Sequence, residues 1–211
     1  MAHGGAHEGM TMNKYLEKHP AVTIALVLGA AVTSSCLTLP AAHSASIPQV
    51  EDSATEKNPP GDIPDTQVFI EYRSALGFSL KVPEGWARKD GPDGVSFTDK
   101  LDGVVVMVSA AASPPSVESV KRDYVLKMEA AGKAVKVAGV RAVKVSGGNA
   151  ILISYTSDSE PNAVTNKQVR LENRRYLYFR NGKLAELDLY APFGADNADQ
   201  WRMMSQSFRW Q

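Results

Sequence analysis

The sequence has 211 residues, 44% of them apolar and 22% charged, which are the proportions of a globular protein with room for one domain and its extensions. Its 23 Lys and Arg residues balance its 23 Asp and Glu residues, so the formal net charge is zero. This balance argues against nucleic acid or an anionic membrane surface as the partner, because both favour a basic excess.

The first 46 residues differ from the rest and indicate an export leader. Lys14 and Lys18 precede the apolar run AVTIALVLGAAV at 21–32, a pattern typical of a signal peptide. The run has about a dozen residues whereas a spanning helix needs roughly 20, which favours cleavage over a permanent membrane anchor. The anchor remains the alternative, and translation can start at Met1 or at Met12.

Two routes of processing fit this leader. The small residues AAHSAS at 41–46 suit signal peptidase. Cys36 is the alternative as a lipid attachment site, although Thr33 stands where lipoproteins usually carry Leu. We therefore expect an exported bacterial protein in the periplasm or at the outer face of the cytoplasmic membrane, with the membrane contacted only through the leader or a lipid.

Histidine and cysteine are confined to the leader. The four histidines stand at positions 3, 7, 19 and 43, and the single cysteine is Cys36. The mature chain therefore has no residues for Ser-His-Asp or Cys-His catalysis, disulfides, structural zinc, haem or iron-sulfur ligation. We expect no cofactor, and the chemistry that remains is carboxylate chemistry or a Ser-Lys pair.

Residues 47–66 contain four prolines and few large apolar residues, which predicts an extended tether, or else a disordered stub left by cleavage. The domain proper is expected over 67–211. Its first half predicts strands at 67–73, 77–82, just after Trp86, at 95–98 and at 104–108. The last of these, VVVMV, is a continuous apolar run and predicts a strand buried on both faces.

A central helix is predicted from Ser116, a suitable N-cap, to Gly132. Its apolar residues Val117, Val120, Tyr124 and Met128 share one face. Four more strands are predicted at 135–145, 149–156, 168–180 and 184–191, with Asn181-Gly182 as a type I′ hairpin turn.

A final helix, capped by Asp196 or Asn197, carries Trp201, Met204 and Phe208 on one face. In the strand before it, Leu187 and Leu189 alternate with polar residues, which predicts one packed and one partly wet sheet face. The predicted fold class is α+β: an antiparallel sheet of about six to eight strands with one central and one C-terminal helix.

Two stretches resemble a known family. GFSLKVPEGWARKDGPDGVSFTDKLDGVVVMVSA at 77–110 is similar to the opening strands of PsbP-like domains, and LDLYAPFGADNADQWRMMSQSFRW at 187–210 is similar to the closing strand and helix of their bacterial exported members. The resemblance implies an α-β-α sandwich and an interaction module, as in photosystem II extrinsic subunits of the thylakoid lumen, a Ran-binding yeast protein and LpqN-type lipoproteins. It supplies no active site and no metal ligand for this chain.

Two residue groups are candidate sites. Four loop aspartates are weak ligands for Ca²⁺, with ordinary turn chemistry as the alternative: Asp90, Asp93, Asp99 and Asp102. One face of the strand around 172–180 combines aromatic rings with cations, as binding hot spots do: Glu172, Arg174, Tyr176, Tyr178 and Arg180. The alternative for this face is solvent or a covering helix.

The leading hypothesis is a non-catalytic envelope protein that docks a protein or an envelope component. Three alternatives remain: a small-molecule or lipid carrier with an enclosed cavity, a PsbP-type accessory subunit of photosystem II, and a hydrolase using two carboxylates about 5–10 Å apart. Ser79 and Lys81 share a strand face, but no signature marks them as a reactive pair. The oligomeric state stays open.

Overall fold

The computed structural model describes residues 60–211. The leader predicted at 1–46, with Cys36, lies outside these residues, as do positions 47–59 of the predicted tether. Within 60–211 no helix has both the length and the apolar character needed to cross a bilayer.

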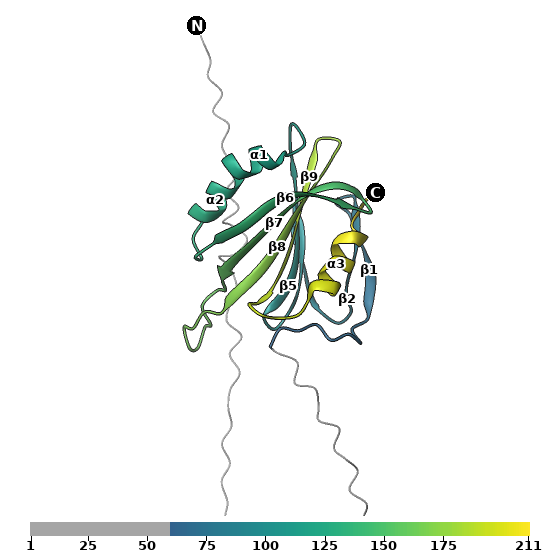
Figure 1. The fold of residues 1–211 in the computed structure, drawn as a ribbon. Helices are drawn as coiled ribbons and strands as arrows, with labels where there is room; N and C mark the ends of the chain where they lie inside the picture. The colour runs from purple at the N-terminus through teal and green to yellow at the C-terminus, as the bar shows by residue number, and fades with distance from the viewer. Residues whose placement is uncertain (1–59) are drawn as a thin grey trace, which may run out of the picture. The chain divides into compact units, whose positions relative to one another are not determined.

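Seven antiparallel strands form the main sheet (Figure 1). Strands of this sheet that are consecutive in sequence pair with each other, except for β5 and β6. β5 pairs instead with β9, which thereby joins the early strands to the late ones. In spatial order the sheet comprises β3 (Ala87–Asp90), β4 (Gly94–Asp99), β5 (Asp102–Ala110), β9 (Lys183–Pro192), β8 (Arg170–Arg180), β7 (Gly148–Asp158) and β6 (Lys136–Val145).

A second sheet holds the remaining strands in the order β1-β2-β10, which corrects the prediction of a single sheet. It comprises β1 (Phe69–Ser74), β2 (Phe78–Pro83) and β10 (Arg209–Trp210). β2 ends at Pro83, the Glu84 N–H still donates to the Val68 carbonyl at 2.8 Å, and Gly85 then turns the chain with a φ of 85°. β3 therefore starts a separate sheet.

The C-terminal helix α3 (Ala198–Ser207) packs against β2 of the small sheet, and both lie on the same face of the main sheet (Figure 1). Its predicted stripe is confirmed, because Trp201, Met204 and Phe208 are at most 4% exposed. The Phe208 ring stacks on that of Tyr178, with centroids 4.2 Å apart. This face of the main sheet therefore lies in the larger core.

The opposite face carries the central helical segment, which has three parts: α1 (Val117–Ser119), η2 (Val120–Tyr124) and α2 (Val125–Ala130). Ser116 begins it with a capping box, as predicted, and Gly132 follows its end at a φ of 93°. The middle part, η2, is π-helical. Val120 and Met128 are buried in a second core that includes Ile151 and Leu177, so the helix covers the β6-β7-β8 side of this face.

Strand β5 differs from its prediction. Val104 and Val106 are fully buried, whereas Val105 and Met107 are half-buried on the other face. The reason is that the central helix packs on the β6-β7-β8 side and leaves the β5 side of that face with less cover. The strand has the one-sided burial that was predicted for β9, where Leu187 and Leu189 are fully buried.

Residues 60–66 belong to the folded domain, so its boundary lies earlier than the predicted position 67. Ile63 is 4% exposed and donates its backbone N–H to Asn197 Oδ1 at 2.7 Å. Asn197 Nδ2 donates in turn to the Gly61 carbonyl at 2.7 Å. Asn197 stands at the N-cap position of α3, but its side chain binds this segment instead of the helix.

Candidate functional site

The predicted aromatic and basic face of β8 is largely covered. Tyr176 and Tyr178 are 6% and 3% exposed, and Tyr178 donates its hydroxyl to the Ser205 carbonyl of α3 at 2.9 Å. Burial raises the pKa of the Tyr178 phenol well above its ordinary value. These two tyrosines are therefore part of the core beneath α3 and do not form a docking surface. This agrees with the alternative interpretation, in which a helix covers this face of the strand.

The two arginines of this face lie at its margins. Arg174 places its guanidinium over the Trp201 ring at 5.2 Å from the centroid and keeps 30% of its side chain exposed. Arg180 donates to the Trp210 carbonyl at 3.2 Å. Arg174 remains available for a ligand.

The four loop aspartates are not gathered into one site. Asp90 binds Arg88 at 2.8 Å, whereas Asp99 and Asp102 oppose each other across the β4-β5 pair. Within residues 60–211 no three acidic, His or Cys side chains are grouped so as to hold a metal ion.

Asp102 is the unusual member of this group. It is 6% exposed, and its Oδ1 atom has no hydrogen-bond partner. Burial, followed by repulsion from Asp99 and Asp62, raises the pKa of Asp102 to about 7. The carboxyl group therefore gains its charge near neutral pH.

The Ser79-Lys81 pair is not a reactive pair in the structure. Ser79 is 2% exposed and its hydroxyl accepts from Gln211 Nε2 at 2.8 Å, while Lys81 is exposed to solvent. The buried hydroxyl is already held by another side chain.

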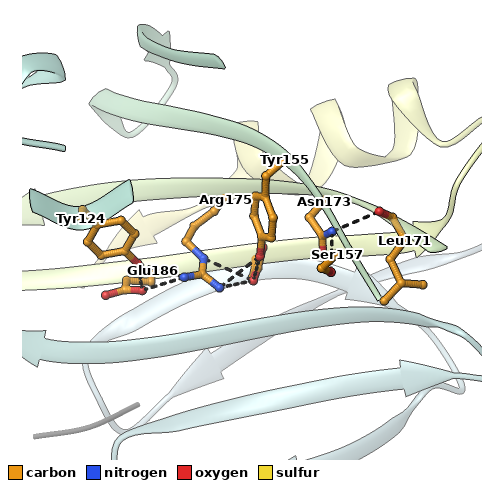
Figure 2. A network of polar contacts seen from close by, with 8 residues as sticks. Tyr124, Tyr155, Ser157, Leu171, Asn173, Arg175 and Glu186 are labelled. Carbon is orange, nitrogen blue, oxygen red and sulfur yellow. Dashed lines mark hydrogen bonds and ion pairs between the residues drawn. The ribbon is translucent and has the colours of Figure 1, made fainter. Parts of the chain in front are cut away.

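A buried network of ionisable side chains spans the other face of the main sheet, beneath the central helix (Figure 2). Arg175 of β8 is at its centre, with 11% of its side chain exposed. Its guanidinium binds Asp188 of β9 and lies 3.6 Å from Glu186. It also donates to the hydroxyls of Tyr124 at 3.0 Å and Tyr155 at 3.1 Å.

Each tyrosine of the network links the arginine to a carboxylate. Tyr155 donates its hydroxyl to Asp188 Oδ2 at 2.6 Å, and Tyr124 donates to Glu186. Burial, countered in part by Arg175, raises the pKa of the Tyr124 phenol, and burial together with Asp188 raises that of Tyr155. Both phenols therefore keep their protons and act as donors.

The arginine holds its charge in this setting. Burial lowers the pKa of the Arg175 guanidinium, but Asp188 and the other members of the network outweigh burial and raise the pKa well above its ordinary value. Glu186 and Asp188 are one carboxylate pair of the described residues, and Asp99 and Asp102 are another. Glu186 and Asp188 are each bound by Arg175 and a phenol, which is the pattern of a structural network that aligns β7, β8, β9 and the central helix.

Sequence reasoning missed a cationic surface at the edge strand β6. Between Glu129 and Asp158 the chain has no acidic residue, whereas it carries Lys133, Lys136, Arg141 and Lys144. β6 ends the strand order of the main sheet and pairs with β7 alone. The charge pattern was readable in the sequence, but the edge position depends on the strand order.

Two hollows flank β6. The first, the α3-side hollow, has a volume of about 460 Å³ and lies between β6, β8 and α3. Its lining includes three arginines from three elements, Arg141, Arg174 and Arg202, together with Gln206. The second, the helix-side hollow, has a volume of about 380 Å³. Its lining combines Val125, Val137 and Val140 with two charged residues of the central helical segment, Lys121 and Glu129.

Comparison with known proteins identifies the fold. No family model and no curated protein matches the chain. The solution structure of cyanobacterial PsbP (CyanoP) from Synechocystis sp. PCC 6803 matches with a TM-score of 0.52 and 15% identity, over 72% of this chain and 98% of that one. At this identity the likeness shows the fold alone, so the chain has a PsbP-like α+β fold.

Two further structures match more weakly. A Bacteroides thetaiotaomicron protein has a TM-score of 0.46 and 10% identity, over 67% of this chain and 48% of that one. PA94 of Pseudomonas aeruginosa, a protein of unknown function, has a TM-score of 0.41 and 15% identity, over 65% and 94% of the two chains.

Proposed function

We propose that this protein is a non-catalytic accessory module of the cell envelope, which docks an acidic partner protein through its cationic β6 edge. The carrying observation is the acid-free stretch 130–157, whose cations lie on or beside an edge strand next to a hollow lined by three arginines. Arginine is enriched at binding hot spots, and a positive patch favours a negative partner.

The arrangement of the acids supports a binding role over a hydrolytic one. Glu186 and Asp188 are bound by Arg175 and are 16% and 15% exposed. A carboxylate hydrolase needs both acids free to act on a substrate. The leader predicted at 1–46 supports export, and the fold of the PsbP-like neighbour suits an accessory module, although a fold does not specify a partner.

The test is capture of a partner by the full chain from the envelope fraction of its source organism. Wild type is compared with Arg141→Glu/Arg202→Glu and with Arg88→Glu, which changes an exposed arginine on β3 at the opposite edge of the sheet. The captured protein is identified by mass spectrometry, and the complex is then rebuilt from the two purified proteins.

We expect the rebuilt complex to form with wild type and with the Arg88 variant, and to weaken at least tenfold with the double variant. Binding should also fall with salt, because exposed charges are screened. Equal binding by all three proteins, or no complex from purified components, would refute docking through this edge.

A further inference from the structure

Strand β6 has the features of an acceptor for an added strand. It is 10 residues long, and among residues 60–211 it has a neighbouring strand on one side only. After a bulge between Val137 and Gly139, its register with β7 is regular from Gly139 to Val145. Backbone groups on the free side of such an edge can pair with an extended segment of another chain.

The two hollows lie on the two sides of this edge. Arg141 and Val143 line the α3-side hollow, whereas Val137 and Val140 line the helix-side hollow. Side chains of a strand alternate between the faces of a sheet. The helix-side hollow adjoins residues 137–140 of β6 and the α3-side hollow adjoins residues 141–145. A strand added beside β6 would therefore direct alternate side chains toward the helix-side hollow along the first part of β6 and toward the α3-side hollow along the second.

The α3-side hollow is matched to carboxylates. Ser146 donates to Gln206 Oε1 from its backbone N–H at 2.8 Å and from its hydroxyl at 2.9 Å. Both bonds use the carboxamide oxygen, which leaves the Gln206 nitrogen as a donor beside the three arginines. A carboxylate accepts such bonds in a bidentate manner from arginine.

The arginines are held only weakly by the chain itself. Arg174 lies 3.9 Å from Glu172, and Arg202 lies 3.2 Å from Asp199 with both side chains at least 70% exposed. Exposed pairs of this kind are readily exchanged. Within residues 60–211, Arg141 forms no ion pair.

Edge protection is the competing explanation, because lysines and bulges on edge strands also prevent aggregation. It accounts for cations along β6 itself. It does not account for Arg174 of β8 and Arg202 of α3, which line the same hollow as Arg141.

We propose that an extended segment of the partner protein, with acidic and apolar residues in alternation, adds to the main sheet as a strand beside β6. Its acidic side chains would enter the α3-side hollow. Its apolar side chains would pack on Val125, Val137 and Val140 of the helix-side hollow, whose lining also includes Lys121 and Glu129. This inference rests on the proposed function, for which it names the partner element.

The test uses labelled 12-residue peptides and the full chain, with binding followed by fluorescence anisotropy. The first peptide alternates Glu with Val. Three matched peptides replace Glu by Gln, rearrange the same composition into Glu-Glu-Val-Val blocks, or carry N-methyl groups on alternate backbone amides. Vesicles containing phosphatidylglycerol are measured in parallel.

We expect the alternating peptide to bind and each matched peptide to bind at least tenfold more weakly. Arg141→Gln/Arg202→Gln should weaken binding of the alternating peptide about tenfold, and Arg88→Gln on the opposite edge should leave it unchanged. Both variants are first compared with wild type in urea denaturation, so that lost binding is not confused with lost folding.

Three results would overturn the inference. The first two are equal binding of the N-methylated peptide and equal binding of the block peptide. The third is that vesicles bind and peptides do not, and that vesicle binding is weakened by Arg141→Gln/Arg202→Gln. If peptide binding fails while the purified partner still requires Arg141 and Arg202, the docking function stands and strand addition is wrong. If both fail, the proposed function falls as well.

Discussion

Arg175 of β8 connects two carboxylates and two phenols from three other elements: η2, β7 and β9. Its side chain is 11% exposed, and those of Glu186 and Asp188 are 16% and 15% exposed. Removing one member of a buried ionic group leaves its partners desolvated without compensation, which costs more than the intact group contributes. The consequence is a large effect from a single substitution.

We expect Arg175→Met to lower the free energy of unfolding by about 3–5 kcal/mol. The matched control is the adjacent Arg174→Met, on the opposite face, whose side chain is 30% exposed and 3.9 Å from Glu172. It should cost at most about 1 kcal/mol. Urea denaturation monitored by circular dichroism measures both. Similar losses in the two variants would show that the network adds nothing beyond an ordinary surface pair.

Asp102 should give the protein a stability that depends on pH. Its pKa is raised from 3.8 to about 7, first by burial and then by Asp99 and Asp62. Below pH 3.8 the folded and unfolded states both hold the proton. As the pH rises toward 7 the unfolded state releases its proton first, so stability is lost across this window and not further above it.

The substitution Asp102→Asn should remove this loss. We expect the variant to match wild type near pH 3.5 and to be more stable by on the order of 4 kcal/mol at pH 8, because the pKa of Asp102 is raised by about 3 units and each unit corresponds to about 1.4 kcal/mol. Denaturation midpoints across this pH range provide the measurement. A difference of the same size at both ends would mean that ionisation is not its cause.

At the scale of elements, α3 shows most clearly how spacing becomes packing. Met204 is fully buried against the main sheet, while its neighbour Met203 is 43% exposed. The two residues have the same side chain and lie in the same helix, so replacing either by Ala changes the helix propensity by nearly the same amount. Their difference therefore isolates burial.

We expect Met204→Ala to destabilise the protein by about 2–5 kcal/mol, from lost burial and the remaining cavity. Met203→Ala should change stability by no more than about 0.5 kcal/mol. Urea denaturation gives both values, and an unchanged slope would show that the unfolded state is the same. Equal effects of the two substitutions would mean that Met204 does not pack in the core.

The π-helical turn η2 is the element that local patterns did not predict. The spacing of Val120, Tyr124 and Met128 predicts the buried face correctly, and all three pack in the second core. The extra residue of the π turn is visible only in the structure, where Tyr124 at its end donates to Glu186.

At the scale of the whole molecule, local signals predicted most elements but not their long-range order. Asn181-Gly182 predicts the β8-β9 turn because both residues accept positive φ, as the values of 49° and 76° confirm. Alternation places Tyr176 and Tyr178 on one face, but it does not say that α3 covers that face. The edge position of β6 likewise follows from β9 pairing with β5, which no local pattern specifies.

The start of the folded domain is also a long-range property. Four prolines made 47–66 resemble a tether, yet Ile63 is buried and Gln200 Nε2 donates to its carbonyl at 3.2 Å. Its partners lie more than 130 positions away in sequence. Composition cannot reveal such contacts.

Residues 60–66 should therefore contribute measurably to stability. We expect a fragment spanning 67–211 to be less stable than one spanning 60–211 by about 3 kcal/mol, since it exposes the site of Ile63 and leaves the buried Asn197 amide without its partners. Within the longer fragment, Ile63→Ala should by itself lower the free energy of unfolding by about 2 kcal/mol, which is most of that loss. Urea denaturation of the three proteins provides the comparison. Equal midpoints for the two fragments would mean that residues 60–66 belong to the tether. A lower midpoint for the shorter fragment would show that contacts from 60–66 stabilise the C-terminal helix.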